Sequence, residues 1–130
     1  MLGERELDVM SVLWDAGSGT VAEVRDRLPT PLAYTTVLTI LRNLEAKGFV
    51  RHTGEGKAHR YHPVLKRSQV GRSMLKRLIA TVFQGSPDQL MTHLVAAHDL
   101  SADELARLRD LASKRLRQRG STRDEQEEET

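Results

Sequence analysis

The chain has 130 residues, a formal net charge of +2, 29% charged and 4% aromatic residues, and no cysteine. This length suits one ordinary domain or two small ones, and the lack of cysteine excludes disulfides, thiolate metal sites and cysteine nucleophiles. The N-terminal stretch contains acidic residues and no apolar segment typical of a signal peptide. The apolar runs are far shorter than the roughly 18 residues that a membrane span requires. We therefore expect a cytoplasmic protein without a membrane partner.

The charges are distributed unevenly along the chain. Residues 33–67 contain seven cations and two anions, whereas residues 124–130 contain five anions and no cation. A basic segment is what a surface that binds a polyanion requires, although a solvated charged face explains the charge alone equally well. The acidic end is either a solubilising tail or a weak competitor for the basic surface.

Three helices are predicted in the first half of the chain. Residues 3–16 have apolar side chains at helical spacing and two glutamates in the first turn. Thr20 and Glu23 have the spacing of a capping box and begin a short helix that ends near Leu28. Two prolines then prevent helix continuation, and a third helix is expected over 33–47.

The third helix has two different faces. Its apolar residues at helical spacing predict a buried stripe, and they are Val37, Ile40, Leu41 and Leu44. The opposite side is rich in threonine, a poor helix former that is unusual on a solvated face. Threonine methyl and hydroxyl groups, with arginine, suit base edges in a major groove. The candidate base-contacting residues are Thr35, Thr36, Leu38, Thr39, Arg42 and Asn43. The alternative is a solvated helix with threonines by chance.

A change of period marks a β-hairpin after the third helix. The runs "FVRHT" and "HRYHPV" are rich in β-branched and aromatic residues and flank two glycines. Pro63 closes the second run, which favours an edge strand. Lys57, His59 and Arg60 are expected at the hairpin tip, where a wing contacts phosphates; a purely structural hairpin is the alternative. The candidates for contact with the DNA backbone are Thr20, Tyr34, Lys57, His59 and Arg60.

This order of elements predicts a winged helix-turn-helix over 1–64, in a mainly α fold with a small β-hairpin wing. Three further amphipathic helices are expected over 65–119, and residues 120–130 lack apolar side chains and are expected to be disordered. The helices of 65–119 would form a thin core alone, which favours packing against a second copy. The candidate dimerisation residues are Leu75, Leu78, Ile79, Val82, Leu94, Leu105, Leu108 and Leu111.

The sequence indicates neither a metal site nor catalysis. His59 and His62 differ in parity on their strand and are expected to face opposite sides, and no carboxylate pair completes a site. No glycine-rich phosphate loop or nucleophile elbow is present. We therefore expect no enzyme activity and no cofactor. A winged-helix module that binds a protein instead of DNA is the alternative function.

The motifs "LGERELDVMSVLW", "TVAEV", "LAYTTVLTILRNLEAKGFV" and "GKAHRYHPV" resemble the penicillinase-repressor family of the BlaI/MecI type. The similarity covers about 3–64 and continues more weakly in "DLSADELARLRDL". It implies a bacterial homodimeric transcriptional repressor that binds dyad operators, often in promoters of β-lactamase or penicillin-binding-protein genes. It also implies that 33–47 is the recognition helix and that the C-terminal helices form the dimer.

Two departures from the family bear on how repression would be relieved. In staphylococcal-type members a sensor-triggered protease cuts an Asn-Phe bond, and His93–Leu94 stands at the aligned position here. The resemblance therefore leaves an inactivating protease in question. Copper-responsive relatives carry a Cys-x-Cys motif near the C-terminus, and because this chain has no cysteine, copper sensing by that route is excluded.

Overall fold

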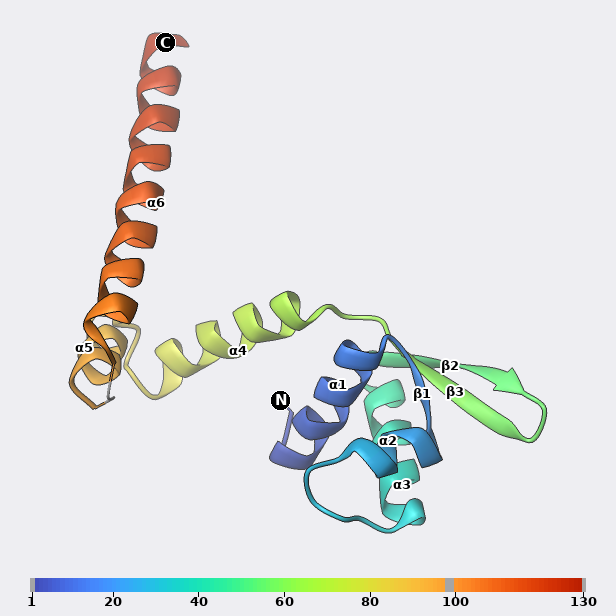
Figure 1. Ribbon diagram of the computed structural model, residues 1–130. Coiled ribbons are helices and arrows are strands. Elements are labelled where there is room, and N and C mark those ends of the chain that lie inside the picture. The colour runs from blue at the N-terminus through green and yellow to red at the C-terminus, as the bar shows by residue number, and fades with distance from the viewer. Residues whose placement is uncertain (1, 98–99, 130) are drawn as a thin grey trace. The chain divides into compact units, whose positions relative to one another are not determined.

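The computed structural model of the protein describes residues 2–97 and 100–129 (Figure 1). The chain divides into two compact units, Met1–Leu78 and Ile79–Thr130. The first unit therefore extends beyond residue 64, which is where the sequence predicts the end of the winged domain.

The first unit contains the predicted winged helix-turn-helix. Its helices are α1 (Glu4–Ala16), α2 (Val21–Arg27) and α3 (Tyr34–Ala46), and its strands are β1 (Gly19–Thr20), β2 (Val50–Glu55) and β3 (Ala58–Pro63). The hairpin of β2 and β3 projects away from the three helices (Figure 1). The remaining helices are α4 (Arg67–Thr81), α5 (Pro87–Ala97) and α6 (Ala102–Glu129). The expected fold, mainly helical with a small wing, is confirmed.

The sheet contains a strand that the sequence did not predict. β1 is two residues long and pairs antiparallel with Arg60 and Tyr61 of β3, which gives the strand order β1-β3-β2. β3 is therefore the central strand, and the edge position predicted for it from Pro63 is wrong. Pro63 is tolerated because β1 pairs only with residues of β3 that precede Pro63. The missing N–H of Pro63 therefore costs no hydrogen bond to β1. On the other side Pro63 lies opposite Val50 at the end of the hairpin.

α3 is held in place by its apolar face. Val37, Leu41 and Leu44 are fully buried and Ile40 is nearly so, as predicted. These side chains pack where α3 contacts α1, α2 and β2. Each buried aliphatic side chain contributes roughly 1.5–3 kcal/mol. Their burial fixes the rotation of α3 about its axis and turns its polar side outward.

The start of α4 is attached to the winged domain. The Nε1–H of Trp14 donates to the carbonyl oxygen of Leu65 at 2.9 Å. The guanidinium of Arg67 lies 5.4 Å from the centre of the Trp14 ring and pairs with Asp15 at 2.7 Å. Val70 is buried in the same core as α3. Trp14, which packs against the core, thus joins α1 to the segment that begins α4.

The second unit begins inside α4 and contains α5 and α6. Both helices are capped at their starts, because Ser86 Oγ accepts from the Gln89 N–H at 3.3 Å and Ser101 Oγ accepts from the Glu104 N–H at 3.1 Å. Among the described residues, no helix combines the length and apolar character needed to span a bilayer.

α6 is longer than the sequence predicted. It continues to Glu129, across most of the stretch 120–130 that was expected to be disordered. Residue 130 lies outside the described residues, and the disorder expected for 120–130 stays a prediction. Glutamate, glutamine and arginine are good helix formers, and they predominate in this stretch without an interrupting proline.

A polar network connects β3 to the start of α2. Arg60 Nη1 and Nη2 donate to the two carboxylate oxygens of Glu23 at 3.0 and 3.1 Å, and Nη1 also donates to Ser18 Oγ at 3.2 Å. Thr20 and Glu23 form the predicted capping box, with bonds of 3.1 and 3.2 Å. The Arg60 hydrogen bond, followed by the Thr20 N–H bond, lowers the pKa of Glu23. Its carboxylate is therefore ionised at neutral pH.

Replacing the carboxylate should expose this pH dependence. Because folding lowers the pKa of Glu23 from its usual 4.5, its ionised form stabilises the fold above that pH and loses the effect as pH falls through the folded value. We expect Glu23→Gln to melt at a lower temperature than the wild type at pH 7, with the difference shrinking below pH ~4. Thermal unfolding followed by circular dichroism measures this.

Asp26→Asn is the matched control. Asp26 lies on the same helix with 69% of its side chain exposed and contacts only its neighbour Arg25, at 3.5 Å, among the described residues. Its replacement should leave the melting temperature nearly unchanged at both pH values. A Glu23→Gln effect of equal size at pH 7 and pH 3 would contradict the role assigned to the ionised carboxylate.

Candidate nucleic-acid interface

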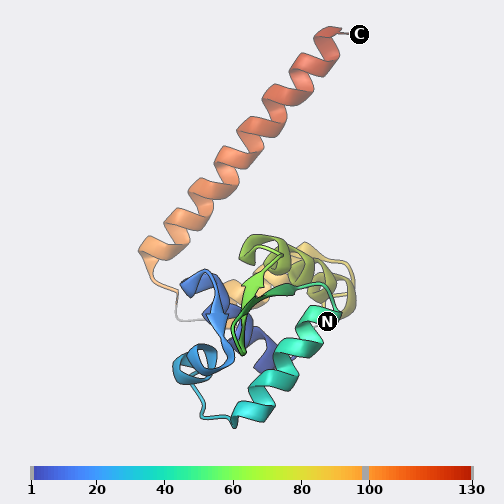
Figure 2. The same ribbon diagram turned by 90° about the vertical axis from the view of Figure 1, so that its right-hand side faces the viewer.

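The outward side of α3 carries the residues predicted to contact bases. Figure 2 shows α3, in turquoise, at the edge of the winged domain. The exposed members of the set are Thr35, Thr39, Arg42 and Asn43, and the half-buried members are Thr36 and Leu38. The helix thus brings all six to one side, opposite its buried stripe.

Arg42 is the cation on this face. Its side chain is exposed and makes no hydrogen bond or ion pair with the described residues. Glu45, one turn further on, is instead held by His52, whose Nδ1 lies 2.7 Å from its carboxylate. The guanidinium of Arg42 therefore keeps its donors for a partner, as bidentate recognition of a guanine edge requires.

The hydroxyl of Thr39 is partly used within the helix. Thr39 Oγ1 donates to the backbone carbonyl of Thr35 at 2.9 Å. A hydroxyl has one donor and two acceptor positions, so Thr39 can still accept a hydrogen bond and present its methyl group. Its contribution to base recognition would come through those two features.

Leu38 has a mixed environment. The sequence predicts it on the exposed side of α3, whereas the structure has it half-buried and packed against the edge of the core. Its apolar side chain therefore stabilises the domain while part of it faces outward. A contact with a thymine methyl uses only that outward part.

The start of α3 has features suited to a phosphate. The N-cap residue Ala33 offers no side-chain hydrogen bond, so the first N–H groups of the helix are not capped by the protein's own side chains. Tyr34 is 46% exposed, and the guanidinium of Arg25 lies 5.9 Å from the centre of its ring. Arg25, in the last turn of α2, was not among the candidates predicted from the sequence, because its position beside Tyr34 depends on the fold of the turn between the two helices.

The hairpin turn carries one of the three predicted wing residues at its tip. Glu55 and Ala58 are the last paired residues of the hairpin, so Gly56 and Lys57 make the turn. Gly56 has φ +59°, the left-handed region that glycine enters without strain. Lys57 is exposed and lies in the turn that joins the two strands of the wing.

His59 lies along the wing rather than at its tip. Its ring stacks on that of His52, with centres 4.5 Å apart and an interplanar angle of 13°. Because His52 is bound to Glu45 of α3, this stack links the wing to the end of the helix. No local sequence pattern indicates this contact, because it depends on strand register.

Arg60 is also away from the tip, and the predicted position is corrected here. It pairs with Thr53 in the middle of the hairpin and with Thr20 of β1, and its side chain is 24% exposed and bound to Glu23. Thr20 is engaged in the capping box of α2. Both residues, expected at the DNA backbone, therefore bind groups of the protein itself. An arginine that binds a distant glutamate from within a strand cannot be recognised from sequence spacing alone.

The histidines of the wing do not gather around one point. His59 lies opposite Gly54 and His62 lies opposite Arg51, which places their side chains on opposite faces of the hairpin, as predicted. His62 Nε2 is 2.9 Å from Thr53 Oγ1. Within 2–97 and 100–129, no three His, Asp or Glu side chains form a metal-binding cluster.

The predicted dimerisation residues are poorly covered in the single chain. Those exposed are Leu75, Leu78, Val82, Leu105 and Leu111, and those half-buried are Ile79, Leu94 and Leu108. Met91, Val95 and Leu116 are further exposed apolar residues on α5 and α6. The pair His93–Leu94 lies inside α5, where His93 Nδ1 is 2.9 Å from the Gln89 carbonyl oxygen.

Comparison with known proteins identifies the family. The penicillinase repressor family matches residues 2–114. The transcriptional regulator BlaI of Mycobacterium tuberculosis (strain H37Rv) is 37% identical over 112 residues, which cover 83% of this chain and 80% of that protein. The methicillin resistance regulatory protein MecI of Staphylococcus aureus (strain N315) is 23% identical over 116 residues, which cover 88% and 94% of the two chains.

A solved structure shares the fold. The structure of a MarR family protein from Bacillus stearothermophilus superposes with a TM-score of 0.52 at 14% identity, covering 92% of this chain and 76% of that one. At this identity the likeness concerns the fold alone. The family match and the winged fold agree, and the chain belongs to the penicillinase repressor family of the BlaI/MecI type, as a DNA-binding transcriptional repressor and not an enzyme.

Proposed function

We propose that the protein acts as a homodimer that binds a pseudo-palindromic promoter operator with α3 in the major groove. The observation that carries this proposal is the two-sided character of α3. One side is buried in the core, while the other exposes hydroxyls, an amide and a guanidinium. A side that the protein's own chain leaves uncovered, with this chemistry, fits base edges.

Specific base recognition is assigned to the middle of α3. Arg42 supplies paired donors for the O6 and N7 of guanine, and Asn43 offers an amide that suits adenine. Thr35, Thr36 and Thr39 supply methyl groups and acceptors nearby. The half-buried position of Leu38 limits it to apolar contact with a thymine methyl.

Contacts with the DNA backbone are assigned to the two edges of this helix. At its start, the uncapped N–H groups beside Tyr34 and Arg25 suit a phosphate. On the wing, Lys57 suits the flanking backbone or the minor groove, and His59 lies beside it. Arg60 and Thr20 act indirectly, because their bonds to Glu23 hold α2 and the wing in position.

Dimerisation is supported by the apolar residues that α4, α5 and α6 leave exposed. A soluble monomer rarely exposes a large contiguous apolar surface, and packing against a second copy would cover these side chains. Two-fold symmetry would then place two α3 helices on half-sites separated by about one helical turn, ~10 bp, or a multiple of it.

Replacing Arg42 tests base recognition directly. We expect Arg42→Ala to weaken binding by ~1–3 kcal/mol to a duplex selected by the protein from a random pool, and to relax base preference at one position in each half-site. Fluorescence anisotropy with the selected and a scrambled duplex measures both effects. Arg72→Ala, which removes the same charge from the exposed surface of α4, is the control and should change neither. Unaltered affinity for the selected duplex would remove Arg42 from base recognition.

Replacing Lys57 tests the wing. We expect Lys57→Ala to reduce affinity for the selected and the scrambled duplex by a similar factor, because binding to a phosphate is independent of sequence. The slope of log K against log salt should become shallower by about 0.9 for each phosphate that the variant no longer neutralises. A reduction confined to the selected duplex would contradict a backbone role and indicate base recognition by the wing.

Replacing Leu111 tests the dimer. Its side chain is 65% exposed in the single chain, so a polar substitution should cost the monomer's fold little. We expect Leu111→Asp to sediment as a monomer, with unchanged helix content by circular dichroism. Its affinity for a two-half-site duplex should fall to that for a single half-site, because avidity is lost. A dimer that persists unchanged would place the interface elsewhere.

A further inference from the structure

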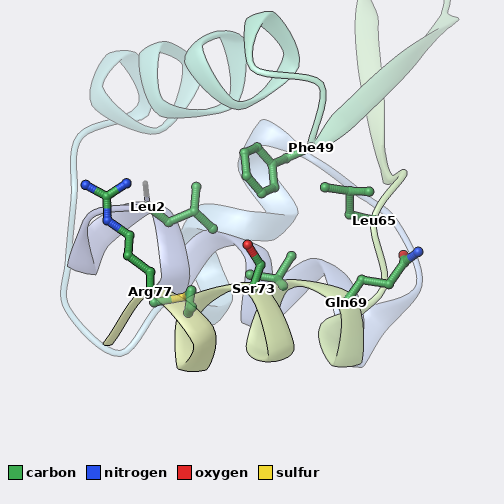
Figure 3. A pocket seen from close by; sticks show the side chains of 8 residues that line it. Leu2, Phe49, Leu65, Gln69, Ser73 and Arg77 are labelled. Carbon is green, nitrogen blue, oxygen red and sulfur yellow. The ribbon is translucent and has the colours of Figure 1, made fainter. Parts of the chain in front are cut away.

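The first unit contains a cavity of about 310 Å³ beside the beginning of α4. Figure 3 shows it from close by, with α4 along one side and Leu2, Phe49 and Leu65 on the others. The proposed DNA-binding surface uses none of these residues. A volume at the lower end of the range for small-molecule sites suits one ring system or a short chain rather than a large cofactor.

The apolar walls of the cavity are continuous with the hydrophobic core. Leu2 and Val70 are 6% and 5% exposed and belong to the core itself. Phe49, Leu65 and Met74 are partly buried and pack against it. Since core residues form the walls, the hollow exists before any ligand binds. An apolar group could therefore move from water into it with little rearrangement of the protein, so little binding free energy is lost.

The polar groups of the cavity lie in one row on α4. Gln69, Ser73 and Arg77 are four residues apart and therefore share one side of the helix. Figure 3 shows the Ser73 hydroxyl in the middle, pointing towards Phe49, with Arg77 at one end of the hollow and Gln69 at the other, its amide turned outward. None of the described lining residues is acidic. The cavity therefore combines an apolar interior with hydrogen-bond donors and one positive charge at its edge.

We propose that this cavity binds a small amphipathic organic anion, an aromatic or medium-chain carboxylate. The ring or chain occupies the space between Phe49 and Met74, and the carboxylate meets Arg77, whose planar guanidinium matches carboxylate geometry. Ser73, one helical turn from Arg77, supplies a further donor, whereas Gln69 lies two turns away and its amide oxygen accepts from the Lys66 N–H at 2.8 Å. A neutral molecule of the same shape fills the cavity but lacks the charged interaction.

The cavity adjoins the segment that follows α3. The Phe49 carbonyl oxygen accepts from the Val64 N–H at 2.9 Å, which joins the start of β2 to the end of β3. Leu65, the next residue, is bound by Trp14. A ligand in the cavity thus contacts both the exit of α3 and the entrance of α4. We expect its binding to change DNA affinity, and this consequence alone rests on the proposed function.

Binding itself is tested without DNA. Full-length protein labelled with ¹⁵N is titrated with 1-naphthoate and octanoate, and separately with 1-naphthamide and octanamide, while amide chemical shifts are recorded. We expect dissociation constants of about 0.1–1 mM for the acids, as befits ligands of roughly ten non-hydrogen atoms. The largest shifts should fall at the lining residues of α4 and at Phe49, and the amides should bind several-fold more weakly.

Two kinds of variant distinguish the contribution of the Arg77 charge to binding from that of the apolar space in the cavity. Arg77→Met should weaken binding of the acids about tenfold and bring it to the level of the amides, whose binding stays unchanged. Arg72→Met, on the same helix but outside the cavity, should match the wild type. Ser73→Trp should fill the hollow and abolish binding of acids and amides alike, while its spectrum stays that of a folded protein.

Three outcomes would overturn the proposal. The first is that neither acid binds at 10 mM, and the second is that the chemical-shift changes are centred outside the lining residues. The third is that Arg77→Met and Arg72→Met weaken binding equally, which would indicate general charge attraction. DNA affinity measured with saturating 1-naphthoate forms a separate arm. If the ligand binds but DNA affinity is unchanged, the proposed effect of the ligand on DNA binding is wrong and the ligand site itself stands. If the protein does not bind DNA at all, only the proposed function is contradicted.

Discussion

The buried stripe of α3 is the constraint on which the rest of the interface depends. Val37, Leu41 and Leu44 are fully enclosed, so the helix cannot rotate without exposing apolar surface, and its outer residues point one way only. An ion pair between Lys47 and Glu6 supports the C-terminal end of α3. There Lys47 Nζ donates to the Glu6 carboxylate at 2.9 Å, and although burial opposes ionisation of Glu6, the hydrogen bonds from Lys47 and the Gly3 N–H outweigh it and lower its pKa. The side of α3 that we propose to contact bases thus belongs to a helix fixed by its core contacts, as recognition of base edges would require.

The wing is coupled to this helix through polar contacts rather than through the core. Glu45 near the end of α3 binds His52, and His52 stacks on His59 further along the hairpin. On the other face of the hairpin, Arg60 reaches Glu23 at the start of α2. The wing is therefore attached to both helices of the helix-turn-helix. Its orientation relative to α3 follows from these contacts, and the turn with the exposed Lys57 lies beyond them along the hairpin.

Much of this architecture could be predicted from local patterns. The aliphatic period of α3, the Thr20–Glu23 capping box and the alternation around two glycines each depend on residues close in sequence, and the corresponding elements are present. The misses depend on tertiary context. β1 is only two residues long and has no period of its own, so the local pattern indicates an edge position for β3. The hairpin pattern likewise predicts Arg60 at the tip. It gives no sign of the ion pair with Glu23, because that partner lies 37 residues away in the sequence.

The central claim is that the outer side of α3 meets DNA. It is tested most directly by adding a selected operator duplex to the ¹⁵N-labelled full-length protein and recording which amide signals change. We expect the largest changes in the first three turns of α3, at Arg25 and around Lys57, with small changes on α5 and α6. Changes confined to the helices of the second unit, with the signals of α3 unmoved at saturation, would contradict it.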